Sequence, residues 1–494
     1  MSEILPEIVF SSSDSSTSRK ISQRVKSGVL RKIFPRIYTS NLEDTDEAIV
    51  SRNLWPILGV LFPGAVVSHR TACEGRPTDS GDFFLTYKYS KNVNLPGIRV
   101  HLLKGHGRLE TDMELPNQLC MSSKARAFLE CLQISRSRSG PPKTLPVKEI
   151  EERLDQICRI QGDDELNRLR DEAREVAAAL NMNREFERLN GMVSALLRTR
   201  PAQELSSPQA RATSRGEPYD PQRLELFNLL FTHLRNTPLP TRRERALSDE
   251  EARNFAFFES YFSNYIEGTE FEVSEAYDIV MKKKIPEDRP KDAHDILGTY
   301  RIVQNQQEMR TVPQSYDEFL RLLKYRHQTV MEGRPENKPG EFKTEANRAG
   351  ETHFVTPELV KGTLLHGFGL YHAVEAGLAR AIFMMFLVSE VHPFIDGNGR
   401  VARIMMNSEL ASAGHNRIIV PTVMRDDNLT VLRALSRGQK PEPLTKFMDH
   451  VQKFSSEIIL SSYDEAVAYL TARNAFVEPV EDRLWLPNSN RGDD

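Results

Sequence analysis

The sequence predicts a mainly α-helical protein whose larger, C-terminal part is all helical apart from one β-hairpin, with a small α+β domain before it. Three observations support this fold class. Apolar residues recur at intervals of three and four over most of the chain after residue 147. Strand-like runs gather earlier, at 82–89 and 98–103. Finally, glycine, asparagine and proline separate the helical segments and supply their ends.

Composition narrows the classes of protein that the chain can form. Its 494 residues favour roughly three domains. A formal net charge of −3 gives no overall attraction to nucleic acid or anionic membranes. The most apolar run, 381–388, is far shorter than the ~20 residues of a membrane span. The start of the chain lacks the pattern of a secretory signal, and the four cysteines lack metal-site or disulfide-framework spacing. We therefore expect a cytoplasmic protein without a membrane partner.

Residues 1–140 are expected to form the α+β domain, with a winged-helix-like beginning. Between 17 and 36 the chain carries seven Lys/Arg and no acid. A helix, a break at Gly28 and a short strand fit the spacing. Such a segment can lie in a DNA groove with its wing on phosphates, or it can be a solvated basic face. The runs 27–38 and 66–72 weakly resemble abortive-infection-type antitoxins and related regulators, which favours the DNA interpretation.

The rest of the chain divides into four parts. Residues 141–200 read as a helical segment with mixed charges, and 201–221, rich in proline and serine, as a linker. A helical domain is expected over 222–460, and a polar tail over 461–494. The domain's expected helices lie near 222–235, 249–267, 272–283, 292–310, 315–331, 357–365, 373–390, 399–413 and 442–460.

The strongest functional signal is the run HPFIDGNGRVAR at 392–403. The proline after His392 predicts that the preceding apolar helix stops there. The following Gly- and Asn-rich turn then opens a new helix near Gly399. Free backbone N–H groups and the positive end of the helix dipole make such a turn a phosphate-binding site.

Four side chains in this run suit chemistry on a polyphosphate. Arg400 and Arg403, three apart on one helical face, can hold phosphates through bidentate contacts. Asp396 offers the hard oxygen that Mg²⁺ prefers. His392, with its near-neutral pKa, suits a general base. A simple helical corner with solvated arginines is far less economical as an explanation of all four.

The run resembles the signature of Fic-domain proteins, and every motif position is filled. The resemblance implies His392 as catalytic base, Phe394 as buried anchor and Asp396 as metal ligand. It implies that Asn398 donates to the α-phosphate in catalysis and that Gly397 and Gly399 shape the anion hole. Arg400 and Arg403 would hold the β- and γ-phosphates of ATP. Relatives of the Doc type, which phosphorylate their targets, usually have Lys at the position of Gly399, so the glycine favours AMP transfer.

Two upstream segments gain meaning beside this motif. Ser263, Glu267 and Gly268 end a helix expected over 249–268, and they resemble the family's inhibitory motif, in which the glutamate pairs with the second motif arginine, here Arg403. A hairpin over 338–357 resembles the flap that aligns a target segment, which would make Lys343 and Thr344 target-positioning residues. Without the resemblance, an exposed helical glutamate and an ordinary surface hairpin would be the simpler interpretations.

These expectations define an autoinhibited protein adenylyltransferase that uses ATP and Mg²⁺ to modify a Ser, Thr or Tyr hydroxyl of a target protein. Glu267 could also serve removal of AMP. A DNA-binding regulator, a toxin–antitoxin-like fusion and a Doc-type phosphotransferase remain alternatives. The target, the modified residue type and the possibility of a homodimer stay open.

Overall fold

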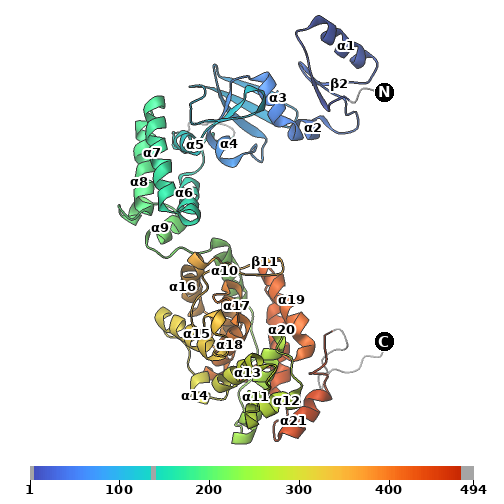
Figure 1. Cartoon of the computed structure of the whole chain (residues 1–494), viewed down its shortest axis with the longest axis vertical. Coiled ribbons are helices and arrows are strands. Elements are labelled where there is room, and N and C mark those ends of the chain that lie inside the picture. Colours follow the sequence, from blue (N-terminus) through green and yellow to red (C-terminus); the bar gives the residue numbers. More distant parts are fainter. Residues whose placement is uncertain (1–4, 135–140, 480–494) are drawn as a thin grey trace. The chain divides into compact units, whose positions relative to one another are not determined.

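The computed structural model describes residues 5–134 and 141–479, and it divides into two compact units, Met1–Gly216 and Glu217–Asp494 (Figure 1). Each unit has apolar cores of its own. Helices dominate the described residues, and strands concentrate in the first unit, as the sequence predicts. The predicted fold class is therefore confirmed.

The first unit begins with a helix and a small sheet. Strand β1 (Ile8–Phe10) pairs with β3 (Ile37–Thr39), which pairs with β2 (Arg31–Phe34), both antiparallel. Helix α1 (Ser15–Lys26) starts at the side chain of Asp14 and buries Ile21. The segment expected as one short strand turns back at Pro35 and Arg36, where Arg36 adopts a φ of 71°, so it forms a hairpin. The winged-helix assignment stays a prediction.

A mixed six-stranded sheet follows, in the order β6-β7-β5-β4-β9-β8. Its central strand β5 carries a continuous buried apolar run, which suits a strand covered on both faces. Helices α2 (Asp46–Arg52), α3 (Leu54–Leu61), α4 (His69–Glu74) and α5 (Lys124–Cys131) accompany it. The strands are β4 (Val66–Val67), β5 (Asp82–Tyr87), β6 (Lys91–Leu95), β7 (Ile98–Lys104), β8 (Met113–Glu114) and β9 (Cys120–Met121).

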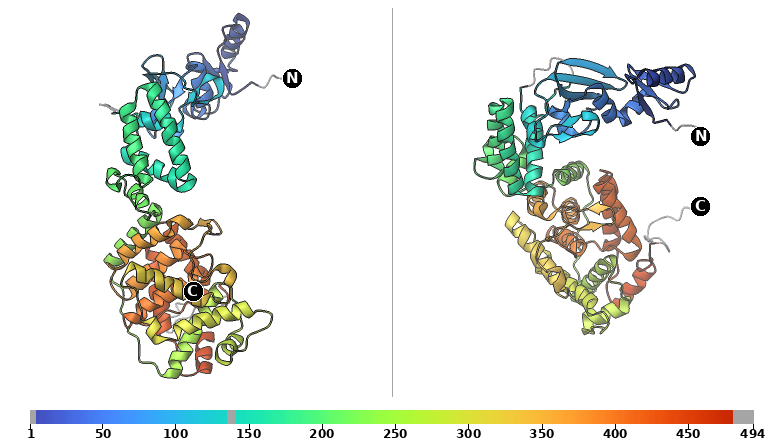
Figure 2. Two further views of the ribbon diagram at one scale, coloured as in Figure 1. Left: turned by 60° about the vertical axis from the view of Figure 1, so that its left-hand side comes forward. Right: turned by 45° about the horizontal axis from the view of Figure 1, so that its top comes forward.

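Three helices, α6 (Val147–Gln161), α7 (Asp163–Leu180) and α8 (Asn183–Leu196), lie side by side and complete the first unit with α9 (Pro208–Ser214) (Figures 1 and 2). The linker expected over 201–221 is wrong for its first part. Leu205 and Ala210 are buried in the core of these helices, and Ser214 donates to a carbonyl of α8. Pro208 starts a short helix here, so the proline and serine of this stretch do not mark a free spacer.

The second unit is a helical domain built around α17 (Leu378–Val391) and α18 (Asn398–Ser412) (Figure 1). Almost every residue of α17 is buried, so this helix forms the centre of the core. The surrounding helices are α10 (Pro221–Asn236), α11 (Asp249–Ile266), α12 (Val273–Lys282), α13 (Pro290–Val303), α14 (Gln306–Met309), α15 (Tyr316–Val330), α16 (Val360–Tyr371), α19 (Arg425–Ser436), α20 (Glu442–Ser456) and α21 (Tyr463–Thr471).

Two expectations for this unit need correction. The helix expected over 292–310 breaks at Asn305, whose side chain caps the separate helix α14. The expected tail over 461–494 contains α21, whose Ala466 and Leu470 are buried against the core; residues 480–494 lie outside the described part. Within the described residues, no helix is long and apolar enough to cross a membrane.

Candidate active site

The site begins where α17 ends. The helix stops at Val391, and His392 takes a left-handed conformation with φ 52° before Pro393. Proline disfavours helical geometry at the residue before it, so the sequence favours a turn of the chain at this point. The turn brings the imidazole to the start of the loop 392–397, which we call the catalytic loop.

The catalytic loop is held from inside the domain. Phe394 is fully buried, and its ring stacks on His327 of α15 at 3.7 Å between centroids. The Asn398 side chain accepts from the backbone N–H of Phe394 and donates to its carbonyl, both at 2.9 Å. Phe394 is thus the anchor that the sequence predicts. The Asn398 amide closes the loop here, whereas the resemblance expected it to donate to a phosphate.

The first turn of α18 has the backbone geometry that the predicted anion-binding site requires. Gly397 precedes the helix with φ 75°, a conformation that favours glycine, and a Cβ there would lie 2.7 Å from the sulfur of Met331. Gly399 opens the helix without a side chain over the backbone N–H groups. The positive end of the helix dipole therefore faces whatever lies above Gly399.

His392 has the geometry of a base. Its Nδ1 lies 3.3 Å from the carbonyl of Ser389, which can only accept, so Nδ1 carries the proton and Nε2 keeps the lone pair. Phe354 stacks on the ring at 3.7 Å and 7°. Burial lowers the pKa of His392 from 6.5 to about 4, so the imidazole is neutral at physiological pH.

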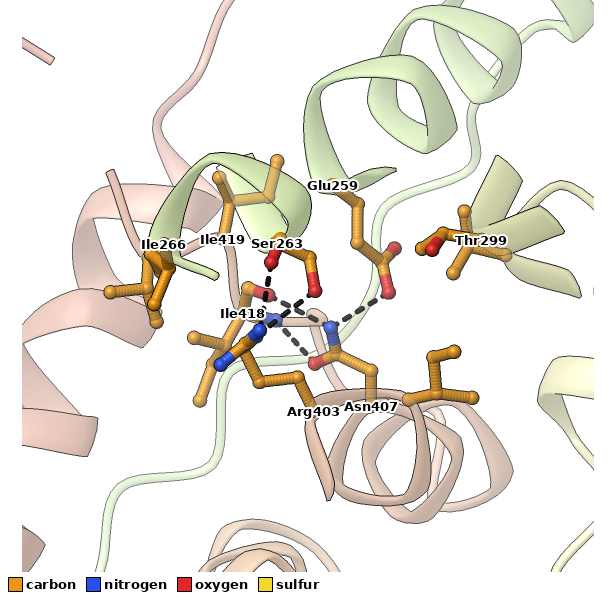
Figure 3. Close-up of a pocket in the computed structure, with 11 residues that line it drawn as sticks. Glu259, Ser263, Ile266, Thr299, Arg403, Asn407, Ile418 and Ile419 are labelled. Carbon is orange, nitrogen blue, oxygen red and sulfur yellow. Dashed lines mark hydrogen bonds between the residues drawn. The ribbon is translucent and has the colours of Figure 1, made fainter. Parts of the chain in front are cut away.

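Glu267 occupies the space above the phosphate-binding turn. Its carboxylate accepts from Arg403 Nη2 at 2.8 Å, and a Cβ on Gly399 would lie 2.1 Å from its Oε1. Ser263, one turn earlier, accepts from Arg403 through both its hydroxyl and its carbonyl (Figure 3). Burial raises the pKa of Glu267, but the charges of Arg403 and Arg400 oppose it and hold the pKa below its ordinary value. Gly268, with φ 90°, ends the helix.

The two motif arginines differ in their surroundings. Both guanidinium groups face α11, because Arg403 contacts Ser263 and Arg400 contacts Asn264. Both arginines are buried, but Arg400 forms its ion pair with Asp295 of α13, at 2.7 Å, whereas Arg403 pairs with Glu267. Asp295 also pairs with Arg334. Arg400 is therefore engaged inside the protein, whereas the sequence predicted two arginines equally available to phosphates.

Asp396 lies at the open side of the catalytic loop. Its side chain is 47% exposed, and its oxygens accept from the Gly397 N–H and the Asn337 amide. In the described part of the chain, no cluster of three or more His, Cys, Asp or Glu side chains could hold a metal ion alone. A cation here would need further oxygens from a substrate.

The expected hairpin is present and is formed by β10 (Arg348–Ala349) and β11 (Thr352–His353). Thr344 is exposed beside it, but Lys343 is buried with its ammonium on the Asn347 side chain at 2.6 Å. Burial lowers the pKa of Lys343 to about 8. Lys343 is thus held inside the protein, whereas a residue that receives a target would face outward.

One cavity of about 230 Å³ joins these parts. His392, Gly399, Arg403 and Glu267 line one end. Residues that sequence reasoning missed line the remainder: Phe354, Met385, Ser389, Glu390, Asn428, Leu429, Leu432, Arg433 and Ser436. Several belong to α19. Its leucines at 429, 432 and 435 repeat every three residues, and Gly438 follows soon after the helix ends. The sequence therefore contained a signal for this helix.

The helical fold, the neutral histidine and the glycine-rich helix start together define a helical protein with a site suited to chemistry on phosphate groups. A sequence profile of the Fic/DOC family matches residues 317–410. A Fido domain-containing protein of Dictyostelium discoideum is 30% identical over 129 residues, which cover 25% of this chain and 90% of the relative. The chain belongs to the Fic/DOC family.

Other relatives match over shorter stretches. The protein adenylyltransferase Fic of Drosophila persimilis is 34% identical over 68 residues, and the match spans 14% of this chain and 13% of the fly protein. A Fic domain-containing signaling protein from Bacteroides thetaiotaomicron has a solved structure that is 16% identical, with a TM-score of 0.37. The match covers 50% of this chain and 97% of that one.

Proposed function

We propose that this protein transfers AMP from ATP to a hydroxyl group of a target protein. One observation carries the proposal: His392, Gly399 and Arg403 line the same cavity. A base, an anion-binding helix start and a cationic fork are the groups that phosphoryl chemistry on a nucleotide requires. The names of the fly relatives agree with this activity.

The cavity suits ATP along its length. Met385, Leu429 and Leu432 give it an apolar wall that fits a nucleobase, while Gly399 and Arg403 form a polar end that fits phosphates. Asp396 fits a Mg²⁺ ion that takes its other ligands from substrate phosphates and water, which is the usual arrangement for this ion. When bound, the ion would neutralise charge on the triphosphate.

The transfer follows from the positions of these groups. The hydroxyl oxygen of the target forms a bond to the α-phosphorus as the bond from that phosphorus to the bridging oxygen breaks, and pyrophosphate leaves. His392 Nε2 accepts the hydroxyl proton. Gly399 and the dipole of α18 stabilise the charge on the phosphates, and Arg403 would hold the terminal one. A serine, threonine or tyrosine could supply the hydroxyl.

We further propose that Glu267 restrains this reaction. It holds Arg403 and lies against Gly399, so it competes with phosphate for both groups. A Lys at position 399, as in Doc-type relatives, would collide with Glu267 in this arrangement. The same carboxylate, beside the base, is also placed to orient water for removal of AMP from a modified target.

The decisive experiment uses ATP labelled separately at the α- and γ-phosphates, with the Glu267→Gly variant as enzyme and self-labelling as readout. We expect α-label on protein and no γ-label, with about 10-fold or greater increase over wild type, because the carboxylate no longer competes with phosphate for Arg403. His392→Ala in the same background should abolish labelling and keep ATP binding. Transfer of γ-label would instead identify a phosphotransferase, and equal labelling of wild type and Glu267→Gly would refute the restraint.

A second candidate function, DNA binding by the first unit, rests on α1. Its Arg19, Lys20 and Lys26 are exposed while Ile21 faces the core, so the helix presents a basic outer face. The hairpin of β2 and β3 follows directly and carries Arg36 at its exposed turn. A helix and a hairpin with one sign of charge suit contact with phosphates.

A further inference from the structure

The segment 343–354 contacts three consecutive residues of the catalytic loop. The backbone N–H of Lys343 donates to the carbonyl of Pro393 at 2.9 Å. The Asn347 amide donates to the carbonyl of Phe394, also at 2.9 Å. The Phe354 ring covers the His392 imidazole. The hairpin of β10 and β11 is therefore fixed to the catalytic loop at both of its ends.

The Phe354 contact is close and flat. The two rings are 3.7 Å apart between centroids and tilted by 7°, and Phe354 also lines the cavity. Its backbone N–H donates to the carbonyl of Asn347, which closes the base of the hairpin. The His392 imidazole also makes a hydrogen bond, from Nδ1 to the carbonyl of Ser389. The imidazole is thus limited in rotation by a hydrogen bond and in tilt by an aromatic face.

We propose that Phe354 is a positioning residue for His392: its ring, carried at the end of the flap hairpin, fixes the imidazole plane and excludes water from one face. This inference rests on the proposed function, because it assumes that His392 accepts the proton. The contact also connects target binding to the base. A target segment that pairs with the hairpin next to Thr352 and His353 would restrict the movement of β11, and Phe354 directly follows that strand.

The electrostatic surroundings of His392 give the inference a readout. The charged groups that act on the imidazole are Lys343 of the flap segment, Glu267 of α11 and Asp396 of the catalytic loop. Burial has the largest effect and lowers the pKa of His392 to about 4. Removing the Phe354 ring admits water to one face, so the pKa should rise toward 6.5, while the charges of Lys343 and Asp396 stay in place.

The test compares Phe354→Ala, Phe354→Leu and Phe354→Tyr in the full-length Glu267→Gly protein. The kcat of self-labelling should fall about 10- to 100-fold in the Ala and Leu variants, since small errors in the position of a catalytic group cost this much. The KM for ATP should stay within about 2-fold, because no phosphate contact is lost. Phe354→Tyr should retain the activity. Phe231→Ala removes an equally half-buried ring from α10 and serves as the matched control.

Titration of the His392 side chain provides the second measurement. Histidine labelled with carbon-13 is followed by NMR across pH, and His392→Gln assigns the resonance among the 12 histidines. We expect an upward shift of about one pH unit or more in Phe354→Ala and Phe354→Leu, and none in Phe231→Ala. An unchanged titration, or an unchanged kcat, would overturn the proposal. If the protein transferred no AMP at all, the titration would still decide whether Phe354 shields His392.

Discussion

His392 acts from a strained position that its neighbours compensate. A φ of 52° is uncommon for a residue with a side chain and costs free energy. The buried Phe394 and the two hydrogen bonds of Asn398 hold the loop that imposes this conformation. The result is an imidazole with its lone pair fixed on Nε2, the arrangement that the proposed base requires before any substrate binds.

The buried imidazole predicts an unusual pH profile. A base must be neutral, so the rate is full above the pKa of His392 and falls as pH drops through it. Because burial lowers that pKa to about 4, the kcat of Glu267→Gly should stay flat from about pH 8 to about pH 6 and decline only below about pH 5. The negative charge of Glu267 raises the pKa of His392, so its loss in this variant moves the acidic decline of kcat to still lower pH.

The profile is measured as kcat at saturating ATP, so that protonation of the nucleotide affects the result little. The Phe354→Ala variant supplies the contrast, since its limb should lie nearer pH 6.5. A limb near pH 6.5 in the parent protein would mean that water reaches the imidazole, and it would contradict the burial of the base.

Single residues differed in how well the sequence predicted them. One cavity contains four residues that the sequence predicts: His392, Gly399, Arg403 and Glu267. They could be predicted because each belongs to a local motif or to a helix end. The ion pair of Arg400 with Asp295 could not be predicted, since Asp295 lies more than a hundred residues upstream on another helix. Partner choice inside a core depends on tertiary packing, which spacing along one helix does not reveal.

At the scale of elements, α11 is attached to α18 by a row of polar contacts. Glu259, Ser263 and Glu267 are four residues apart and share one helical face. Opposite them, Asn407 donates to Glu259 at 2.8 Å and Arg403 donates to Ser263 (Figure 3). Arg403 also donates to Glu267. The proposed inhibitory glutamate therefore follows a helix that is held against α18 at Ser263, one turn earlier, and at Glu259, two turns earlier.

This arrangement predicts that Ser263→Ala weakens the restraint without removing it. The change deletes one of the hydrogen bonds that Arg403 donates and leaves the carbonyl contact and Glu267 in place. Self-labelling with α-labelled ATP should rise about 2- to 10-fold over wild type, below the level of Glu267→Gly. Ser274→Ala, on the exposed face of α12, is the control and should leave labelling unchanged. A decrease, or a rise that equals Glu267→Gly, would contradict the graded restraint.

Elements with a clear stop were predicted well, and those whose signal was weak were not. The break between α17 and α18 falls where Pro393 and the glycines require it. Helix α19 was missed because its apolar residues form a short row between polar ones, and α9 because proline and serine suggested a linker. Both helices depend on burial against distant segments, as Ala210 and Leu435 show. Composition alone does not report such burial.

At the scale of the whole molecule, the chain joins two units with separate cores and different fold classes. The net charge of −3 conceals an uneven distribution, because the stretch 15–36 contains basic residues and no acid. Long-range attraction to DNA is therefore weak for the whole protein, and any binding must come from local phosphate contacts.

Salt dependence distinguishes such contacts from a solvated face. The full-length protein should retain a 20-base-pair duplex of arbitrary sequence at about 50 mM salt and lose it steeply as salt rises. Arg19→Ala combined with Lys20→Ala should reduce the magnitude of the slope of log affinity against log salt by about one to two. Each phosphate contact that is lost leaves its counterions bound to the DNA, so binding releases fewer of them. Lys88→Ala with Lys91→Ala removes the same charge from exposed positions of the six-stranded sheet domain. Equal slopes for the two double variants would assign the effect to net charge, and they would leave α1 as a solvated basic face.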